Sequence, residues 1–163
     1  MILRPTTESN LDTILKIERD ESNAPYIRQW SREKHLGAIL NEDIGHVIIE
    51  SIADSRTVGY VIVTGLHNED QNIEFKRIAL AEKGKGYGRS AVQLIKRLAF
   101  DVYGAHRLWL EVMVHNHPAY HLYESEGFVP EGRCRDGVKL GDEFITTNVM
   151  SVLEPEYRQT VGE

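Results

Sequence analysis

The stretch Lys83-Gly84-Lys85-Gly86-Tyr87-Gly88-Arg89-Ser90 largely decides how this chain folds. It follows an apolar strand pattern over residues 73–80 and precedes an amphipathic helix pattern over residues 91–102. Three glycines at alternate positions let the backbone turn sharply, and the helix start presents unpaired N–H groups and a positive dipole end. With three cationic side chains added, the stretch predicts a phosphate or pyrophosphate site.

Two common phosphate-binding motifs do not fit this stretch. A P-loop requires a Gly-Lys pair followed by Ser or Thr, and the chain has no such triplet. A dinucleotide fingerprint, G-x-G-x-x-G, counted from Gly84 meets Arg89 where the third glycine belongs. That fingerprint also belongs to an early strand, whereas this stretch lies in the middle of the chain.

A third spacing, [Gln/Arg]-x-x-Gly-x-[Gly/Ala], is met by Lys83, Gly86 and Gly88, with lysine in the first place. A second segment has Leu110-Glu111-Val112, then Asn116, Ala119, Leu122-Tyr123-Glu124 and Gly127-Phe128. Together these resemble the GNAT acetyltransferases, in particular ribosomal-protein N-terminal alanine acetyltransferases and polyamine acetyltransferases. The resemblance is close over residues 57–152 and holds in outline over the first fifty residues.

The resemblance implies acetyl-coenzyme A as co-substrate. In the family, main-chain groups of the preceding strand pair with the pantetheine arm, which implicates Ile78, Ala79 and Leu80. An asparagine in the position of Asn116 also bonds that arm. Lysine at position 83 keeps a hydrogen-bond donor but lacks the planar guanidinium fork, so cofactor affinity is expected to be modestly weaker. The loop and helix start that would hold the pyrophosphate are Lys83, Gly84, Lys85, Gly86, Tyr87, Gly88, Arg89 and Ser90.

The strand before the loop carries a break in its alternation. Its apolar residues fall on odd positions at Ile73 and Phe75 but on even positions at Ile78 and Leu80. Because side chains alternate faces along a strand, this slip predicts a β-bulge near residues 76–77. The resemblance implies that this strand splays from the next one and exposes backbone groups to the coenzyme; an ordinary edge bulge without a ligand is the alternative.

Glu111 is the candidate general base. The strand pattern over residues 107–114 places it between Trp109 and Met113 on one face. Desolvation by these two side chains would raise the pKa of the Glu111 carboxylate, which suits a base that must accept a proton near neutral pH. The resemblance assigns this position to the base. An ion pair with Arg107 is the alternative interpretation, and Glu74 on the neighbouring strand is the reserve.

Tyr123 is the candidate general acid. The resemblance implies that its hydroxyl points at the coenzyme sulfur, and a phenol suits a departing thiolate; simple core packing is the alternative. Asn116 precedes Pro118 and a short helix pattern, so it is also expected to be the helix N-cap.

The fold class expected is α/β (α+β), with one GNAT domain over residues 1–163. It comprises a single mixed, mostly antiparallel, splayed sheet of about six or seven strands flanked by about four helices. Strand patterns cover residues 2–4, 45–51 and 57–66. The first helix carries an apolar stripe of Leu11, Ile14, Leu15 and Ile17, and a second, capped by Ser31, carries His35, Leu36, Ile39 and Leu40.

Charge and composition limit the partners. The net charge is −6, with 25 acidic residues against 19 lysines and arginines, which disfavours nucleic acid. One cysteine, Cys134, cannot form an internal disulfide, and neither a signal-peptide pattern nor a membrane-spanning run is present. A soluble cytoplasmic monomer or homodimer is expected. His115, His117 and His121 lie close together, but no carboxylate completes a zinc motif, so no metal is predicted.

The predicted function is transfer of an acetyl group from acetyl-coenzyme A to a primary amine, by direct attack in a ternary complex. The acceptor could be a protein N-terminus, a polyamine or another small amine. Alternatives are a non-catalytic acetyl-coenzyme A sensor, an aminoglycoside-type acetyltransferase and an enzyme using a nucleotide. Glu18, Asp20 and Glu21, near the end of the first helix, could attract a cationic acceptor or could be solvated surface.

Overall fold

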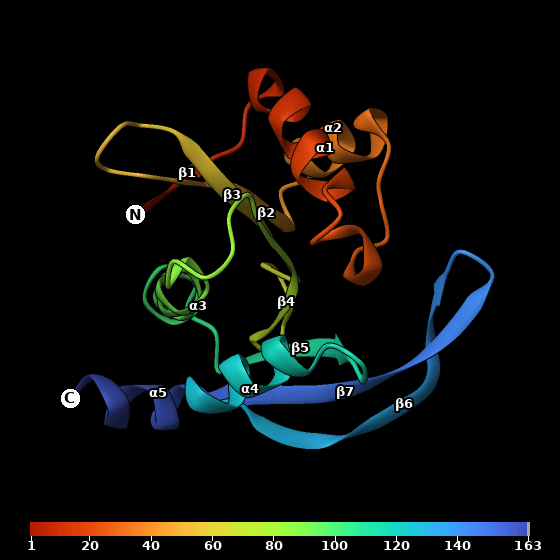
Figure 1. The fold of residues 1–163 in the computed structure, drawn as a ribbon. Coiled ribbons are helices and arrows are strands. Elements are labelled where there is room, and N and C mark those ends of the chain that lie inside the picture. Colours follow the sequence, from red (N-terminus) through yellow and green to blue (C-terminus); the bar gives the residue numbers. More distant parts are fainter. Residues whose placement is uncertain (163) are drawn as a thin grey trace.

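The computed structural model of this protein describes residues 1–162, and it contains one seven-stranded sheet in the order β1-β2-β3-β4-β5-β7-β6 (Figure 1). All neighbours are antiparallel except β4 and β5, which are parallel. The expected mixed, mostly antiparallel sheet is confirmed. The strands are β1 (Ile2–Pro5), β2 (Ile44–Glu50), β3 (Thr57–Thr64), β4 (Asn72–Leu80), β5 (Arg107–Met113), β6 (Val129–Leu140) and β7 (Glu143–Leu153).

Within residues 1–162, five α-helices accompany the sheet, one more than the sequence indicated. The additional one, α5, follows β7 directly, and the Glu156 carboxylate accepts a hydrogen bond from the Leu153 N–H at its start. None of the helices within residues 1–162 combines the length and apolar character needed to cross a bilayer. The helices are α1 (Leu11–Arg19), α2 (Arg32–Ile39), α3 (Tyr87–Arg97), α4 (His117–Ser125) and α5 (Glu154–Val161), with short turns η1 (Glu8–Asn10), η2 (Ala24–Tyr26) and η3 (Leu98–Val102).

Two apolar clusters lie on opposite faces of the sheet. Alternate residues of β3 divide between them: Val61 and Val63 pack on the side of α3 and α4, whereas Tyr60 and Ile62 pack on the side of α1 and α2. Figure 1 shows α1 and α2 on one side of β2 and β3 and α3 on the other. We call these the α3 face and the α1 face.

The predicted bulge in β4 is confirmed. The register of β4 against β3 shifts between the pairs Ile62–Arg77 and Val63–Phe75, which leaves Lys76 as the extra residue. The slip keeps Phe75 and Ile78 on the α3 face and turns Arg77 towards the α1 face.

The expected splay between β4 and β5 is also confirmed. The two strands pair at only three positions, Asn72–Arg107, Ile73–Leu108 and Glu74–Trp109. Beyond the last of these, β5 continues to pair with β7 on its other side as far as Met113. Beyond this point the C-terminal halves of β4 and β5 form no ladder hydrogen bonds with one another.

The glycine loop enters α3 through left-handed backbone. Gly84 has φ +76° and Gly86, the N-cap of α3, has φ +75°, a region that residues with a Cβ rarely adopt. The helix begins at Tyr87, four residues before the apolar stripe that predicted its start at Ala91. A stripe shows only where a helix is buried, so it could not reveal the exposed first turn.

Two apolar residues within the predicted helices are exposed. Val102 is 69% exposed because the chain forms a π-helical turn over Leu98–Val102, which adds a residue and rotates the stripe so that Phe100 becomes buried. Leu40 is 75% exposed because α2 ends at Ile39.

Candidate active site

A cavity of about 800 Å³ occupies the splay between β4 and β5. Its walls come from residues 22–34, from β4 and β5, from the glycine loop, from the start of α4 and from the β6–β7 hairpin. It therefore joins segments from both halves of the chain. The predicted site residues that line it are Ile78, Leu80, Lys83, Gly84, Tyr87, Gly88, Glu111, Asn116 and Tyr123.

Other predicted residues lie beside this cavity rather than in its wall. The Ala79 side chain packs in the apolar cluster of the α1 face. The Lys85 ammonium pairs with Glu82, and Arg89 donates to Glu126 at 2.5 Å and to Ser125 at 3.2 Å. Gly86 and Ser90 belong to the N-cap and first turn of α3.

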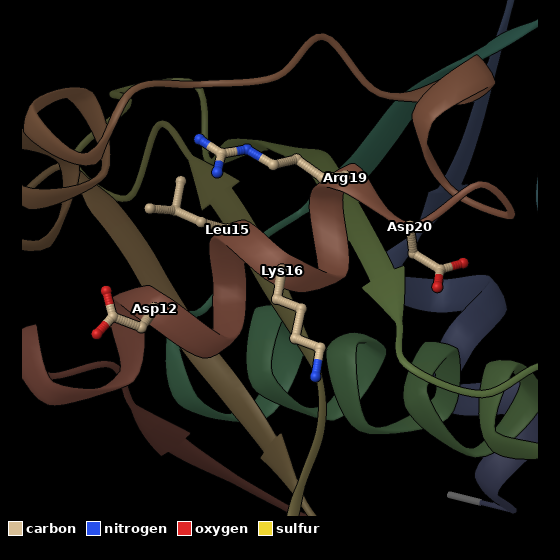
Figure 2. Close-up of a pocket in the computed structure, with 5 residues that line it drawn as sticks. All are labelled: Asp12, Leu15, Lys16, Arg19 and Asp20. Carbon is tan, nitrogen blue, oxygen red and sulfur yellow. The ribbon is translucent and has the colours of Figure 1, made fainter.

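A second hollow, of about 460 Å³, lies on the outer side of α1 (Figure 2). Figure 2 shows Lys16 and Arg19 extending in different directions from the same helix. It shares no lining residue with the cavity at the splay and contains none of the predicted catalytic or coenzyme-binding residues, although Asp20 lies in its wall. Its lining residues are Asp12, Leu15, Lys16, Arg19 and Asp20.

Asn23 ties the glycine loop to the end of α1. The Lys83 ammonium donates to Asn23 Oδ1 at 2.6 Å, and Asn23 Nδ2 donates to the carbonyls of Ile17 and Leu80, each at 2.9 Å. Burial lowers the pKa of Lys83, against a smaller opposing effect of Asp20. No local pattern marked Asn23, because its partners come from three separate segments.

Tyr123 combines a buried ring with a position in the cavity wall. It is 8% exposed, and its ring contacts those of Phe75 and Phe128 at centroid distances of 5.8 and 5.7 Å. Burial raises the pKa of Tyr123, because the phenolate would lose its hydration. The phenol therefore holds its proton until a stronger base appears.

Asn116 is the N-cap of α4, as predicted. Its Oδ1 accepts a hydrogen bond from the Ala119 N–H at 3.4 Å, and Pro118 occupies the first turn. The side chain also lines the cavity. The helix closes at Gly127, with φ +93°, and Phe128 is buried behind it.

The surroundings of Glu111 differ from those predicted. Trp109 and Met113 do not desolvate it: Glu111 is exposed, because β4 has already diverged where Glu111 faces the cavity. The alternative ion pair with Arg107 is also wrong, since the Arg107 guanidinium pairs with Glu131 at 2.7 Å. Glu111 contacts Cys134, and that contact raises the pKa of the thiol.

Glu74, the reserve base, lies on the opposite wall. Its carboxylate accepts a hydrogen bond from the Thr64 hydroxyl at 3.1 Å and lies 3.8 Å from the Lys76 ammonium. It is thus held by two neighbours.

Glu18 is fully buried, contrary to both expectations for it. Its Oε1 accepts hydrogen bonds from Tyr60 at 2.5 Å and Arg77 at 2.6 Å, and lies 3.0 Å from His35 Nε2. Its Oε2 accepts from the Trp30 N–H. Burial raises the pKa of Glu18, but the bonds from His35 and Tyr60 and the charge of Arg77 outweigh it and leave the pKa lowered.

This network extends across the α1 face. His35 Nδ1 and His46 Nε2 are 3.0 Å apart, and His46 Nδ1 lies 2.8 Å from the Thr6 hydroxyl. Burial, with a smaller effect of His35, lowers the pKa of His46 to about 4, so this ring is neutral at pH 7. At its other end, Arg77 reaches the cavity wall.

A model of the acetyltransferase (GNAT) family matches residues 11–128, more than half of the chain. The chain belongs to this family. The match spans the splay, the glycine loop and α4 through Phe128, so the resemblance seen in the sequence is confirmed. As a GNAT N-acetyltransferase, the protein uses acetyl-coenzyme A.

The chain is similar in sequence to named acetyltransferases. It is 28% identical to a spermidine N(1)-acetyltransferase of Vibrio cholerae over 64% of this chain and 61% of that enzyme. It is 30% identical to a protein of Bacillus subtilis named as a putative [ribosomal protein bS18]-alanine N-acetyltransferase, over 76% of this chain and 77% of that one.

Solved structures match the fold. A spermidine N-acetyltransferase of Vibrio cholerae in complex with CoA and spermine superimposes with a TM-score of 0.85 over 96% of both chains, at 23% identity. This likeness shows that the GNAT fold extends over nearly the whole chain.

An aromatic stack joins the segment before α2 to the turn between β5 and α4. The rings of Tyr26, in the segment before α2, and His115, between β5 and α4, lie 5.3 Å apart with an interplanar angle of 26°. His115 thus packs against Tyr26, which lines the cavity. His121, further along α4, lies 3.8 Å from Glu124.

Proposed function

We propose that the cavity at the splay transfers an acetyl group from acetyl-coenzyme A to a primary amine while both are bound. The main support is that one cavity is lined by the glycine loop, by the candidate acid and by the candidate base. The amine nitrogen attacks the thioester carbonyl carbon, the carbon–sulfur bond breaks, and coenzyme A leaves as its thiolate. Binding both substrates removes translational freedom from the attack.

The coenzyme is proposed to bind along β4 and the start of α3. Main-chain groups at Ile78 and Leu80, which have no ladder partner on β5, pair with the pantetheine arm, and the Ile78 N–H polarises the thioester carbonyl. Ala79 lies between them, with its own main-chain groups directed at Tyr60 of β3. Asn116 contacts the same arm. The pyrophosphate lies over the α3 N-terminus, contacted by Lys83, Gly84, Lys85, Gly86, Tyr87, Gly88, Arg89 and Ser90.

Tyr123 is proposed as the acid and Glu111 as the base. Tyr123 packs in the cluster of the α3 face, whereas Glu111 alternates with Leu110 and Val112 of that cluster and so lies on the α1 face. The thiolate takes its proton from Tyr123 on the coenzyme side, and the amine gives up its proton to Glu111 on the acceptor side. The Glu74 carboxylate is already held by Thr64 and Lys76, so Glu111 is favoured as the general base.

The names of the relatives provide the first acceptors to test, a polyamine and a protein N-terminus. Another small amine and an aminoglycoside complete the set. A sensor that binds the coenzyme without turnover would need neither an acid nor a base, and this cavity contains candidates for both.

The test measures coenzyme A release with each acceptor, for the wild-type protein and for Glu111→Gln and Glu74→Gln. We expect Glu111→Gln to lower kcat by about a hundredfold at unchanged acetyl-coenzyme A KM, and Glu74→Gln to lower it by only a few-fold. Equal effects would contradict the choice of base. Thermal stabilisation by ATP but not by coenzyme A would overturn the proposed function.

A further inference from the structure

The acceptor side of the cavity carries more positive than negative side chains, on a protein whose net charge is −6. The two acidic lining residues on this side are Glu74 and Glu111. The four cationic lining residues there are Arg28, Lys34, Lys76 and Arg77.

The coenzyme does not account for these cations. Its pyrophosphate is proposed to lie at the glycine loop, which leads into α3 on the α3 face. Arg77 and Trp30 belong to the α1 face: Arg77 bonds Glu18 of α1, and Trp30 packs in the cluster of that face. The cations therefore line the side from which the acceptor must approach.

Arg77 is a rigid part of this wall. Its side chain is 9% exposed, and its guanidinium donates to Glu18 and to the Arg28 carbonyl, each at 2.6 Å. The guanidinium also lies 4.7 Å from the centre of the Trp30 ring, and the Lys34 ammonium lies 4.6 Å from the same ring. Two cations are thus held around one aromatic side chain.

Two of the four cations have their charge neutralised by a carboxylate of the protein, and the other two do not. Glu18 neutralises Arg77, and Glu74 lies 3.8 Å from Lys76. Within residues 1–162, no carboxylate forms an ion pair with Arg28 or Lys34. Across the cavity Glu111 is exposed, and the described part of the chain provides no cation paired with it.

The two walls therefore differ in the sign of their free charge. We propose that the acceptor is an amine that also carries an anionic group, such as the carboxylate of an amino acid; this deepens the proposed function and rests on it. The ammonium lies at Glu111 before it loses its proton, and the anionic group lies at Lys34 and Arg28. A polyamine complements only the first wall and is repelled by the second.

The test compares amines with the same number of carbon atoms that differ in their second group, which is a methyl, a carboxylate or an amine: butylamine, γ-aminobutyrate and putrescine, and likewise ethylamine, glycine and ethylenediamine. Coenzyme A release is measured at saturating acetyl-coenzyme A. We expect kcat/KM to be at least about tenfold higher for the anionic member than for the neutral one in one or both sets, and lowest for the diamine. Salt should reduce this preference.

Lys34→Glu is the matching variant. It places Glu three residues after the N-cap Ser31, which creates a capping box, so α2 is retained. We expect it to abolish the preference for the anionic member and to improve putrescine. Lys16→Glu, the same change of charge on the outer side of α1, should leave the order unchanged.

The outcomes separate the two proposals. This inference is overturned if the diamines have the highest kcat/KM. It is also overturned if neither anionic amine is acetylated while another amine is. In both cases the proposed function still stands. An unchanged preference in Lys34→Glu overturns this inference as well. Failure of acetyl-coenzyme A to bind in calorimetry overturns the proposed function, and this inference with it.

Discussion

The face of the sheet that packs against α3 and α4 is closed mainly by aliphatic and aromatic side chains and also buries the ion pair Lys96–Glu126. The face beneath α1 and α2 instead buries a carboxylate and two imidazoles in one network, with the part-buried guanidinium of Arg77 beside them. Apolar packing is not directional, so the α3 face depends on volume and shape. The network around Glu18 depends on every partner being present, because an unpaired buried charge is costly. The two faces should therefore respond differently to small changes.

The largest expected effect is on the α1 face. Glu18→Gln keeps the shape but leaves the Arg77 guanidinium, which is 9% exposed, without a counter-charge, and should lower the free energy of unfolding by about 3 kcal/mol. The exposed Glu21→Gln should change it by less than about 0.5 kcal/mol. Urea denaturation measures both. If Glu18→Gln lowered the free energy of unfolding by less than about 1 kcal/mol, the α1 face would not depend on its buried network.

On the α3 face, a change in the buried side chain should affect chemistry rather than stability. Tyr123→Phe keeps the ring contacts with Phe75 and Phe128, so unfolding should change by less than about 1 kcal/mol. Without the proton donor, kcat should fall by about a hundredfold. Tyr120→Phe, on the same helix and outside the cavity lining, is the control. A wild-type kcat in Tyr123→Phe would exclude it as the acid.

Acid should weaken the α1 face before the α3 face. His46 has its folded pKa lowered to about 4 from an unfolded value of 6.5, so between these values the unfolded chain binds more protons and stability falls as the pH falls. From pH 7 to pH 5 the loss should be about 2 kcal/mol, measured by urea denaturation at each pH. The exposed His67→Gln should keep this slope. A flat profile over that range would contradict a neutral buried His46.

The smallest expected effect is the change in stability when either of two glycines is replaced by alanine. Gly86, with φ +75°, should not accept a Cβ easily, so Gly86→Ala should destabilise by about 1 kcal/mol and weaken acetyl-coenzyme A binding in calorimetry. Gly37, inside α2, has open space around its Cα, and Gly37→Ala should stabilise by about 0.5–1 kcal/mol. Effects of the same sign would show that loop geometry at Gly86 is not the constraint.

The sequence predicted best what depends on neighbours along the chain. The bulge at Lys76 followed from the alternation of Phe75 and Ile78, and the glycine loop followed from its own spacing. Glu18 did carry a signal, because it follows Leu11 and Ile14 on one face of α1. That period indicates burial, but it does not name His35, Tyr60 and Arg77 as the partners.

The site shows the same division. The identity of the residues at the splay followed from motifs, whereas the exposure of Glu111 did not, since it depends on how far β4 diverges from β5. The pairing of Lys83 with Asn23 likewise joins residues sixty positions apart.

The order of residues by itself determined the strand alternation, the bulge, the left-handed loop and the family to which the chain belongs, because each depends on short-range geometry. Only the tertiary structure decided which charges are buried, which neutralise one another and which remain free in the cavity. Ion pairs and desolvation depend on distances between segments that meet only after the sheet has formed. The sign of the free charge facing the acceptor is therefore a property of the fold.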